Sequence, residues 1–81
     1  MNFEVEVRIS LKPGILDPEA RAIQHALADL GFPTTRLSTA RVFSISLEAE
    51  DRSRAEERAR QMCERLLANP VIHRYEVEAR E

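Results

Sequence analysis

The sequence predicts one α+β domain, with two helices on one face of a four-stranded antiparallel sheet. Three observations support this. Apolar and polar residues alternate near both ends and in the middle of the chain, as in strands with one buried face. Between them lie two segments whose apolar residues recur at helical spacing. The length of 81 residues leaves room for a single domain over residues 1–81. The expected order is strand, helix, strand, strand, helix, strand.

The first strand is predicted over residues 3–11. Its odd-numbered residues are apolar and should face the helices, whereas the even-numbered residues between them are polar. The inward set is Phe3, Val5, Val7, Ile9 and Leu11. Pro13 and Gly14 then end the strand.

The first helix is predicted to begin at Pro18. Proline is tolerated at the first helical position, and Asp17 before it is a good N-cap. Gly31 should close the last turn in the left-handed conformation. The face expected to be buried consists of Ala22, Ile23, Ala26, Leu27 and Leu30.

Two strands are predicted in the middle of the chain, and the sequence pattern is clearer for the second than for the first. Residues 34–39 contain β-branched side chains but no strong apolar face, so they are predicted as a short, exposed edge strand. Residues 42–47 are a stronger candidate, because Phe43, Ile45 and Leu47 alternate with polar residues.

The second helix is predicted to start in the charged stretch 48–60. Residues 53–56 have the capping-box spacing, with Ser53 as the expected N-cap. The apolar stripe that follows is Ala55, Ala59, Met62, Cys63, Leu66 and Leu67. Asn69, expected in the left-handed conformation, and Pro70 should end the helix. A last strand should follow from residue 71, with Val71, Tyr75 and Val77 inward.

This order restricts the topology. Each strand has one apolar face, so both helices should cover the same side of the sheet. Right-handed crossovers then favour a ferredoxin-like arrangement with the first and third strands central. The opposite side of the sheet should be polar and either face water or meet a polar partner surface.

Composition argues against several classes of function. The net charge of −2 disfavours nucleic-acid binding, and no apolar run approaches the roughly 20 residues needed to cross a bilayer. We therefore expect a soluble, cytoplasmic protein without membrane contact. A single cysteine cannot form an internal disulfide, which agrees with a reducing compartment. The small core makes association with other subunits a reasonable expectation.

No catalytic, cofactor-binding or metal site is predicted. Cys63 shares a helical face with apolar residues, which favours a packing role. His25 and His73 lie on different elements, and His73 is best interpreted as a half-exposed structural residue. The carboxylates of residues 48, 50 and 51 lack the apolar surroundings that would raise a pKa, so a solvated loop is expected there.

Residues 12–18 form a loop that allows two interpretations. Two prolines stiffen it, and Ile15 and Leu16 add more apolar area than a simple connection needs. These two residues could close the end of the core. Alternatively, the loop is a preformed docking surface for another protein.

Three motifs, in order along the chain, carry a family resemblance. They read KPGILDP at residues 12–18, ALADLGF at 26–32 and LLANPVI at 66–72. Together they resemble the PurS family, the small subunits of bacterial and archaeal phosphoribosylformylglycinamidine (FGAM) synthase. The resemblance implies a non-catalytic accessory subunit in de novo purine biosynthesis, within an ATP-dependent carbon–nitrogen ligase.

The resemblance also implies partners. PurS-like proteins are expected to form homodimers or higher homo-oligomers and to hold a glutaminase subunit, PurQ, against a synthetase subunit, PurL, assisting ammonia transfer. That complex converts formylglycinamide ribonucleotide (FGAR), glutamine and ATP into FGAM, glutamate, ADP and phosphate. It uses ATP and Mg, whereas no cofactor is expected on this chain.

The matching positions define a candidate partner interface. It consists of Lys12, Gly14, Ile15, Asp17, Pro18, Asn69 and Pro70. The chain departs from the family pattern in two places. Ala40 stands where the family usually has a glycine, and His73 stands where an acidic residue is common.

Two other functions remain open from the residues alone. A small ferredoxin-like domain could be a ligand-sensing regulatory module, whose melting temperature would rise with free amino acids. An acylphosphatase-like enzyme would need an arginine and an asparagine in a phosphate-cradling first loop, and residues 12–18 contain neither.

Overall fold

The computed structural model describes residues 1–81. In chain order the elements are strand β1 (Asn2–Leu11), helix α1 (Pro18–Asp29), strand β2 (Ala40–Glu48), helix α2 (Arg52–Met62), a π-helical turn η1 (Cys63–Leu67) and strand β3 (His73–Arg80). Neither helix has the length and hydrophobicity needed to span a membrane.

The sheet has three antiparallel strands in the order β2-β1-β3. Val5 lies opposite Ile45 and Ala79, so the odd-numbered residues of all three strands share one face. The α+β class, the central position of β1 and the inward parity of its odd residues are as the sequence predicted.

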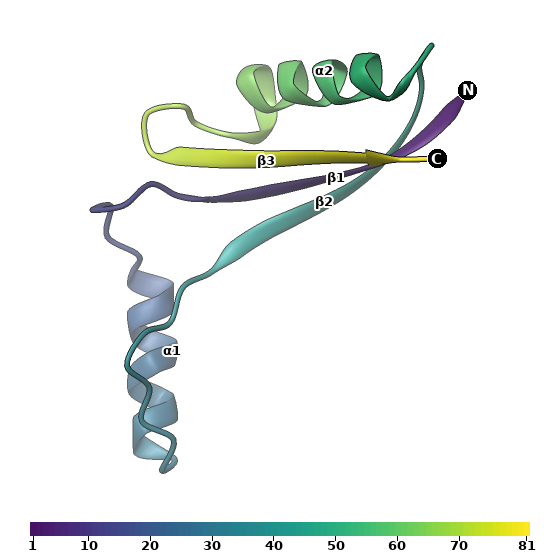
Figure 1. The fold of residues 1–81 in the computed structure, drawn as a ribbon. Coiled ribbons are helices and arrows are strands. Elements are labelled where there is room, and N and C mark those ends of the chain that lie inside the picture. The colour runs from purple at the N-terminus through teal and green to yellow at the C-terminus, as the bar shows by residue number, and fades with distance from the viewer.

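Helix α2 covers this odd-numbered face. It lies along β1 and β3 (Figure 1), and its small residues Ala55 and Ala59 are fully buried against the strands. The buried core consists of Phe3, Val5, Val7, Ile9, Ala55, Ala59, Cys63, Ala68 and Ala79. Small residues on α2 let the helix approach the larger side chains of β1 closely.

The predicted fourth strand is absent. Residues 34–39 form no strand and return alongside α1 (Figure 1), where the Gln24 side chain donates to the carbonyl oxygen of Thr34 at 3.1 Å. The segment has no apolar face to bury, so the sheet gains little by adding it. Strand β2, predicted to be central, is consequently an outer strand with one unpaired edge.

Helix α1 does not cover the sheet, contrary to the prediction. It projects from one end of the sheet (Figure 1), and the radius of gyration is 16.0 Å. A compact chain of this length would have a radius of gyration of about 12 Å. Of the predicted inward face, Leu27 is half-buried and the other four residues are exposed, and Ala20 is the buried residue of α1. Periodicity shows that a helix has an apolar face but not what covers it.

Both ends of α1 are as predicted. The Oδ1 atom of Asp17 accepts a hydrogen bond from the backbone N–H of Ala20 at 3.0 Å. Gly31 has a φ of +94°, and its N–H donates to Ala28 while that of Phe32 donates to Leu27. This pair of bonds is a Schellman motif, which uses the carbonyl groups left free at a helix end.

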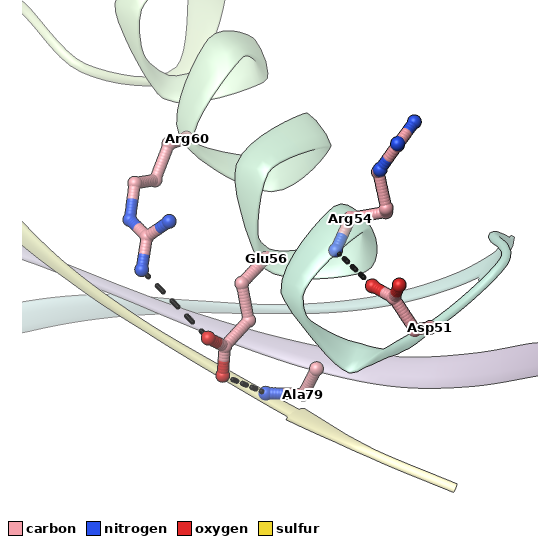
Figure 2. A network of polar contacts seen from close by, with 5 residues as sticks. All are labelled: Asp51, Arg54, Glu56, Arg60 and Ala79. Atoms are coloured by element: carbon pink, nitrogen blue, oxygen red, sulfur yellow. Dashed lines mark hydrogen bonds and ion pairs between the residues drawn. The ribbon is translucent and has the colours of Figure 1, made fainter.

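Helix α2 starts earlier than the capping-box pattern predicted. Its N-cap is Asp51, whose Oδ1 accepts from the N–H of Arg54 at 2.8 Å (Figure 2), and Ser53 already lies inside the helix. The Glu56 carboxylate binds the backbone N–H of Ala79 at 3.1 Å, so it does not return to Ser53 as a capping box requires.

The end of the second helix also differs from the prediction. The N–H of Ala68 donates to the carbonyl oxygen of Cys63 at 2.9 Å, five residues back, which makes η1 a π turn. The wider turn places Leu67 and Ala68 toward the sheet and leaves Leu66 83% exposed. Val71 was also predicted inward but lies in the turn before β3 and is 76% exposed.

Candidate partner interface

The candidate interface begins with a tight turn after β1. The N–H of Ile15 donates to the carbonyl oxygen of Lys12 at 3.2 Å, across Pro13 and Gly14. Gly14 has a φ of +86°, and a Cβ there would meet nothing within 4 Å. The glycine is therefore required by the backbone conformation and not by space, as in turns with proline second and glycine third.

Lys12 connects the two parts of the candidate interface. Its Nζ donates to the carbonyl oxygen of Pro70 at 2.6 Å, and its backbone N–H donates to Ile72 at 2.8 Å. The two motifs, 58 residues apart in sequence, thus lie side by side where β1 ends and β3 begins.

Asn69 organises the second motif. Its Oδ1 accepts from the N–H of Val71 at 3.0 Å, and its own N–H donates to Nδ1 of His73 at 2.9 Å. No residue other than glycine has a positive φ, so the left-handed conformation predicted for Asn69 is wrong. The side chain closes the turn instead. His73 is half-buried and hydrogen-bonded, which confirms its predicted structural role.

Asp17 holds the base of α1 to the chain that enters β2. Its second carboxylate oxygen, Oδ2, accepts from the hydroxyl of Thr39 at 2.8 Å. The hydrogen bond from the N–H of Ala20, and after it the one from Thr39, lower the pKa of Asp17 because both stabilise the charged form. Pro18 follows as the first residue of the helix.

The two aliphatic residues of the loop do not close the core. Leu16 is 74% exposed and Ile15 is 40% exposed. The first interpretation of this loop, that both residues close the end of the core, is therefore wrong. The apolar surface lies next to the Lys12–Pro70 contact in sequence and is available to a partner.

The other candidate groups are not assembled into a reactive site. No three His, Cys, Asp or Glu side chains lie close enough to hold a metal ion. Cys63 is fully buried in the core, which confirms its packing role, and burial raises the pKa of its thiol, with a smaller contribution from Glu64. Asp51, expected in a solvated loop, is the N-cap of α2.

Sequence reasoning missed the role of Thr39, since nothing in its neighbourhood indicates a partner 22 residues earlier. It also missed Asp51 as a cap, although an aspartate three residues before a helical N–H is a usable signal.

Comparison with known proteins identifies the family. The model of the family PurS, phosphoribosylformylglycinamidine (FGAM) synthase, matches residues 4–81. The chain belongs to the PurS family. This PurS chain is therefore a subunit of FGAM synthase, an enzyme of purine biosynthesis, as the sequence predicted.

The similarity extends over nearly the whole chain. The PurS subunit of Methanothermobacter thermautotrophicus is 44% identical over 81 residues, which are 100% of this chain and 96% of the relative. The crystal structure of Methanocaldococcus jannaschii PurS has a TM-score of 0.89 at 40% identity, covering 98% of this chain and 96% of that one.

A third relative was solved within a complex. The structure of PurLQS from Thermotoga maritima contains a chain with a TM-score of 0.89 at 28% identity, covering 99% of both chains. A TM-score this high over nearly the full length requires that α1 and its return segment superpose as well as the sheet. The projecting helix is thus shared with these PurS structures.

Proposed function

We propose that this PurS chain is a non-catalytic bridge that holds a PurQ glutaminase against a PurL synthetase and assists the transfer of ammonia between them. The main observation behind the proposal is the hydrogen bond from Lys12 to Pro70, which holds the two motifs together. The exposed aliphatic residues Ile15 and Leu16 follow in the same loop. The T. maritima relative, solved as part of PurLQS, supports these partners.

A bridge can assist catalysis without a reactive side chain. Ammonia released into water is protonated and loses its nucleophilicity, so the rate depends on how well two active sites are aligned and sealed. A domain of 81 residues is too small to enclose a long tunnel, which favours alignment over conduction. ATP and Mg then belong to the complex, in the cytoplasm, and not to this chain.

We further propose that the chain forms a homodimer or higher homo-oligomer through α1. In one copy, the helix leaves Ile23 40% and Leu30 72% exposed, and Phe32 just beyond it 65% exposed. A helix of this length is only marginally stable in isolation, and in proteins it gains most of its stability from burying such a face. A surface of this kind therefore needs a partner.

The molecule offers a matching surface. Helix α2 leaves the β2 half of the sheet uncovered, and a groove of about 660 Å³ lies there, with apolar lining residues Phe43, Ile45, Met62, Leu66 and Leu67. The sequence predicts two helices on this face of the sheet, and the chain itself supplies one. The α1 helix of a second copy would supply the other.

The bridge is tested by light scattering. The isolated protein should have the mass of a homo-oligomer, and mixing with PurL and PurQ, in the presence of glutamine and Mg-ADP, should give a larger complex. Replacing Lys12 and Ile15 by alanine should leave the far-ultraviolet circular dichroism unchanged and weaken the complex. Unchanged assembly would reject this loop as the interface, and hydrolysis of glutamine or ATP by the purified subunit would reject the non-catalytic role.

A further inference from the structure

A second surface feature lies at the base of α1, on the side of the sheet opposite α2. It is a hollow of about 340 Å³ between the end of β1, the start of β3 and residues 36–40. Four cationic side chains line it: Arg8, Lys12, Arg36 and Arg74. We call it the basic hollow.

These four cations have no ion-pair partner. The two ion pairs of the structure join the N-terminus to Glu48 and Arg60 to Glu56, both away from the basic hollow. Such a concentration of positive charge is unexpected in a chain whose net charge is −2. It is costly to hold together without an anion, because like charges repel.

The two carboxylates that line the hollow do not neutralise it. Asp17, whose two oxygens accept hydrogen bonds from the N–H of Ala20 and from the Thr39 hydroxyl, stays charged and offsets one of the four positive charges. Glu76 lies opposite Arg8 in the register of β1 and β3 and offsets one charge at most. Positive charge therefore remains in excess.

Hydrogen-bond donors accompany the charge. Nε of Arg74 donates to the hydroxyl oxygen of Ser10 at 3.2 Å, which orients the guanidinium and leaves its terminal N–H groups available. Lys12 uses one donor on Pro70 and has two more. The hydroxyl of Ser38 also lines the hollow. Guanidinium groups and hydroxyls are the donors that bind phosphate oxygens in proteins.

We propose that the basic hollow binds the phosphate group of a small phosphorylated molecule. Four cationic side chains are more than a ligand with a single carboxylate would need, and their positive charge repels metal ions. The volume is at the lower end of the range for small-molecule sites, about 300–1,000 Å³. All the lining residues belong to one chain, so phosphate binding here does not depend on the proposed bridging of PurQ and PurL.

The basic hollow lies between the sheet and the segment that returns from α1, so a bound ligand would contact both. Arg8, Ser10 and Arg74 belong to the sheet, whereas Arg36, Ser38 and Thr39 belong to the segment that returns from α1. A phosphate held by both groups links α1 to the sheet. Binding therefore reduces the motion of α1 relative to the sheet and favours the orientation seen in Figure 1.

The test is titration of the isolated protein, followed by amide NMR shifts and by melting temperature. The probes are inorganic phosphate and ribose 5-phosphate, with ribose and matched sodium chloride as controls. Saturable shifts are expected for the amides of residues 10, 12, 36–39 and 74, together with a rise in melting temperature. Ribose and salt should give neither. A tighter response to ribose 5-phosphate than to phosphate would show that the attached group is also recognised, and an equal response that phosphate is recognised alone.

Matched charge variants make the test specific. Arg36→Gln and Arg74→Gln should each weaken phosphate binding about tenfold or more, which corresponds to the loss of one charged hydrogen bond of about 1.5–3 kcal/mol. Arg52→Gln removes the same charge at the exposed start of α2 and should change affinity less than twofold. Absence of saturable shifts, or an equal loss in all three variants, would overturn the proposal.

Discussion

The carboxylate of Glu56 in α2 accepts a hydrogen bond from the backbone N–H of Ala79 in β3, with 3.1 Å between Oε2 and N (Figure 2). Strand β3 is an outer strand, so this N–H points away from β1 and would otherwise lack a partner in the sheet. Arg60, 3.7 Å from the other carboxylate oxygen, supports the arrangement. Helix α2 thus protects one edge of the sheet, whereas the outer edge of β2 stays unpaired.

Replacing Glu56 by alanine should lower the free energy of unfolding by about 1–3 kcal/mol, because the buried N–H of Ala79 loses its acceptor. Urea unfolding measures this difference. Glu56→Gln keeps an acceptor oxygen and should recover part of the loss. Glu57→Ala, at the exposed neighbouring position, is the control and should change stability by less than about 0.5 kcal/mol. Equal effects at the two positions would contradict the role of Glu56.

Local signals along the sequence predicted the individual elements well. The alternation in β1, the cap at Asp17 and the glycine after α1 all depend on residues within a few positions of one another. The second N-cap was misplaced by two residues, because Ser53 and Asp51 are both good caps and the choice depends on Glu56 reaching Ala79. That contact is 23 residues away and has no local signature.

Tertiary placement was predicted less well. The residues expected to pack one face of α1 against the sheet are exposed apart from Leu27, because helical periodicity indicates an apolar face but not what it packs against. The same limit applies to residues 34–39, whose composition permits a strand that the sheet does not use. The closeness of Lys12 and Pro70, in contrast, follows from antiparallel topology, since the end of β1 must meet the start of β3.

The N-cap of α1 should respond to pH. Because the pKa of Asp17 is lowered in the folded protein, its contribution to helix stability is fully present above the unfolded value of 3.8 and is lost as the pH falls through the lower folded value. Amide exchange in α1, followed by NMR, should accelerate below that pH. Asp17→Ala should show fast exchange already at pH 7 and no further acid effect. Thr39→Val, which removes the second hydrogen bond, should move the Asp17 pKa upward, and an unchanged pKa would contradict the contact.

Cys63 should be unreactive in the native protein. Its side chain is fully buried and burial raises the pKa of the thiol, so little thiolate is formed or exposed at pH 8. A thiol reagent such as DTNB should react only at the rate of unfolding and should react fully in urea. Cys63→Ser should destabilise the fold by about 1–3 kcal/mol, because a hydroxyl is buried without a partner. Rapid modification without denaturant would show that the helix end opens readily.

Self-association through α1 should be sensitive to charge on one helical face. Leu30→Glu places a carboxylate on the side that carries Ile23 and Leu27, and it should lower the mass measured by light scattering toward that of a monomer. Ala28 lies on the opposite side of the helix, so Ala28→Glu adds the same charge and should leave the mass unchanged.

Leu66→Glu tests the other half of the same contact. Leu66 lines the groove beside β2 and is 83% exposed in one copy, so the substitution should cost an isolated copy little stability. If α1 of a second copy occupies the groove, the carboxylate loses its contact with water in the interface and the oligomer is weakened, because burying a charge is costly even with Arg58 and Arg65 lining the same groove. Circular dichroism should remain that of a folded protein. A variant that keeps the wild-type mass would place α1 of the second copy elsewhere, and loss of mass in Leu30→Glu alone would point to contact between two α1 helices instead.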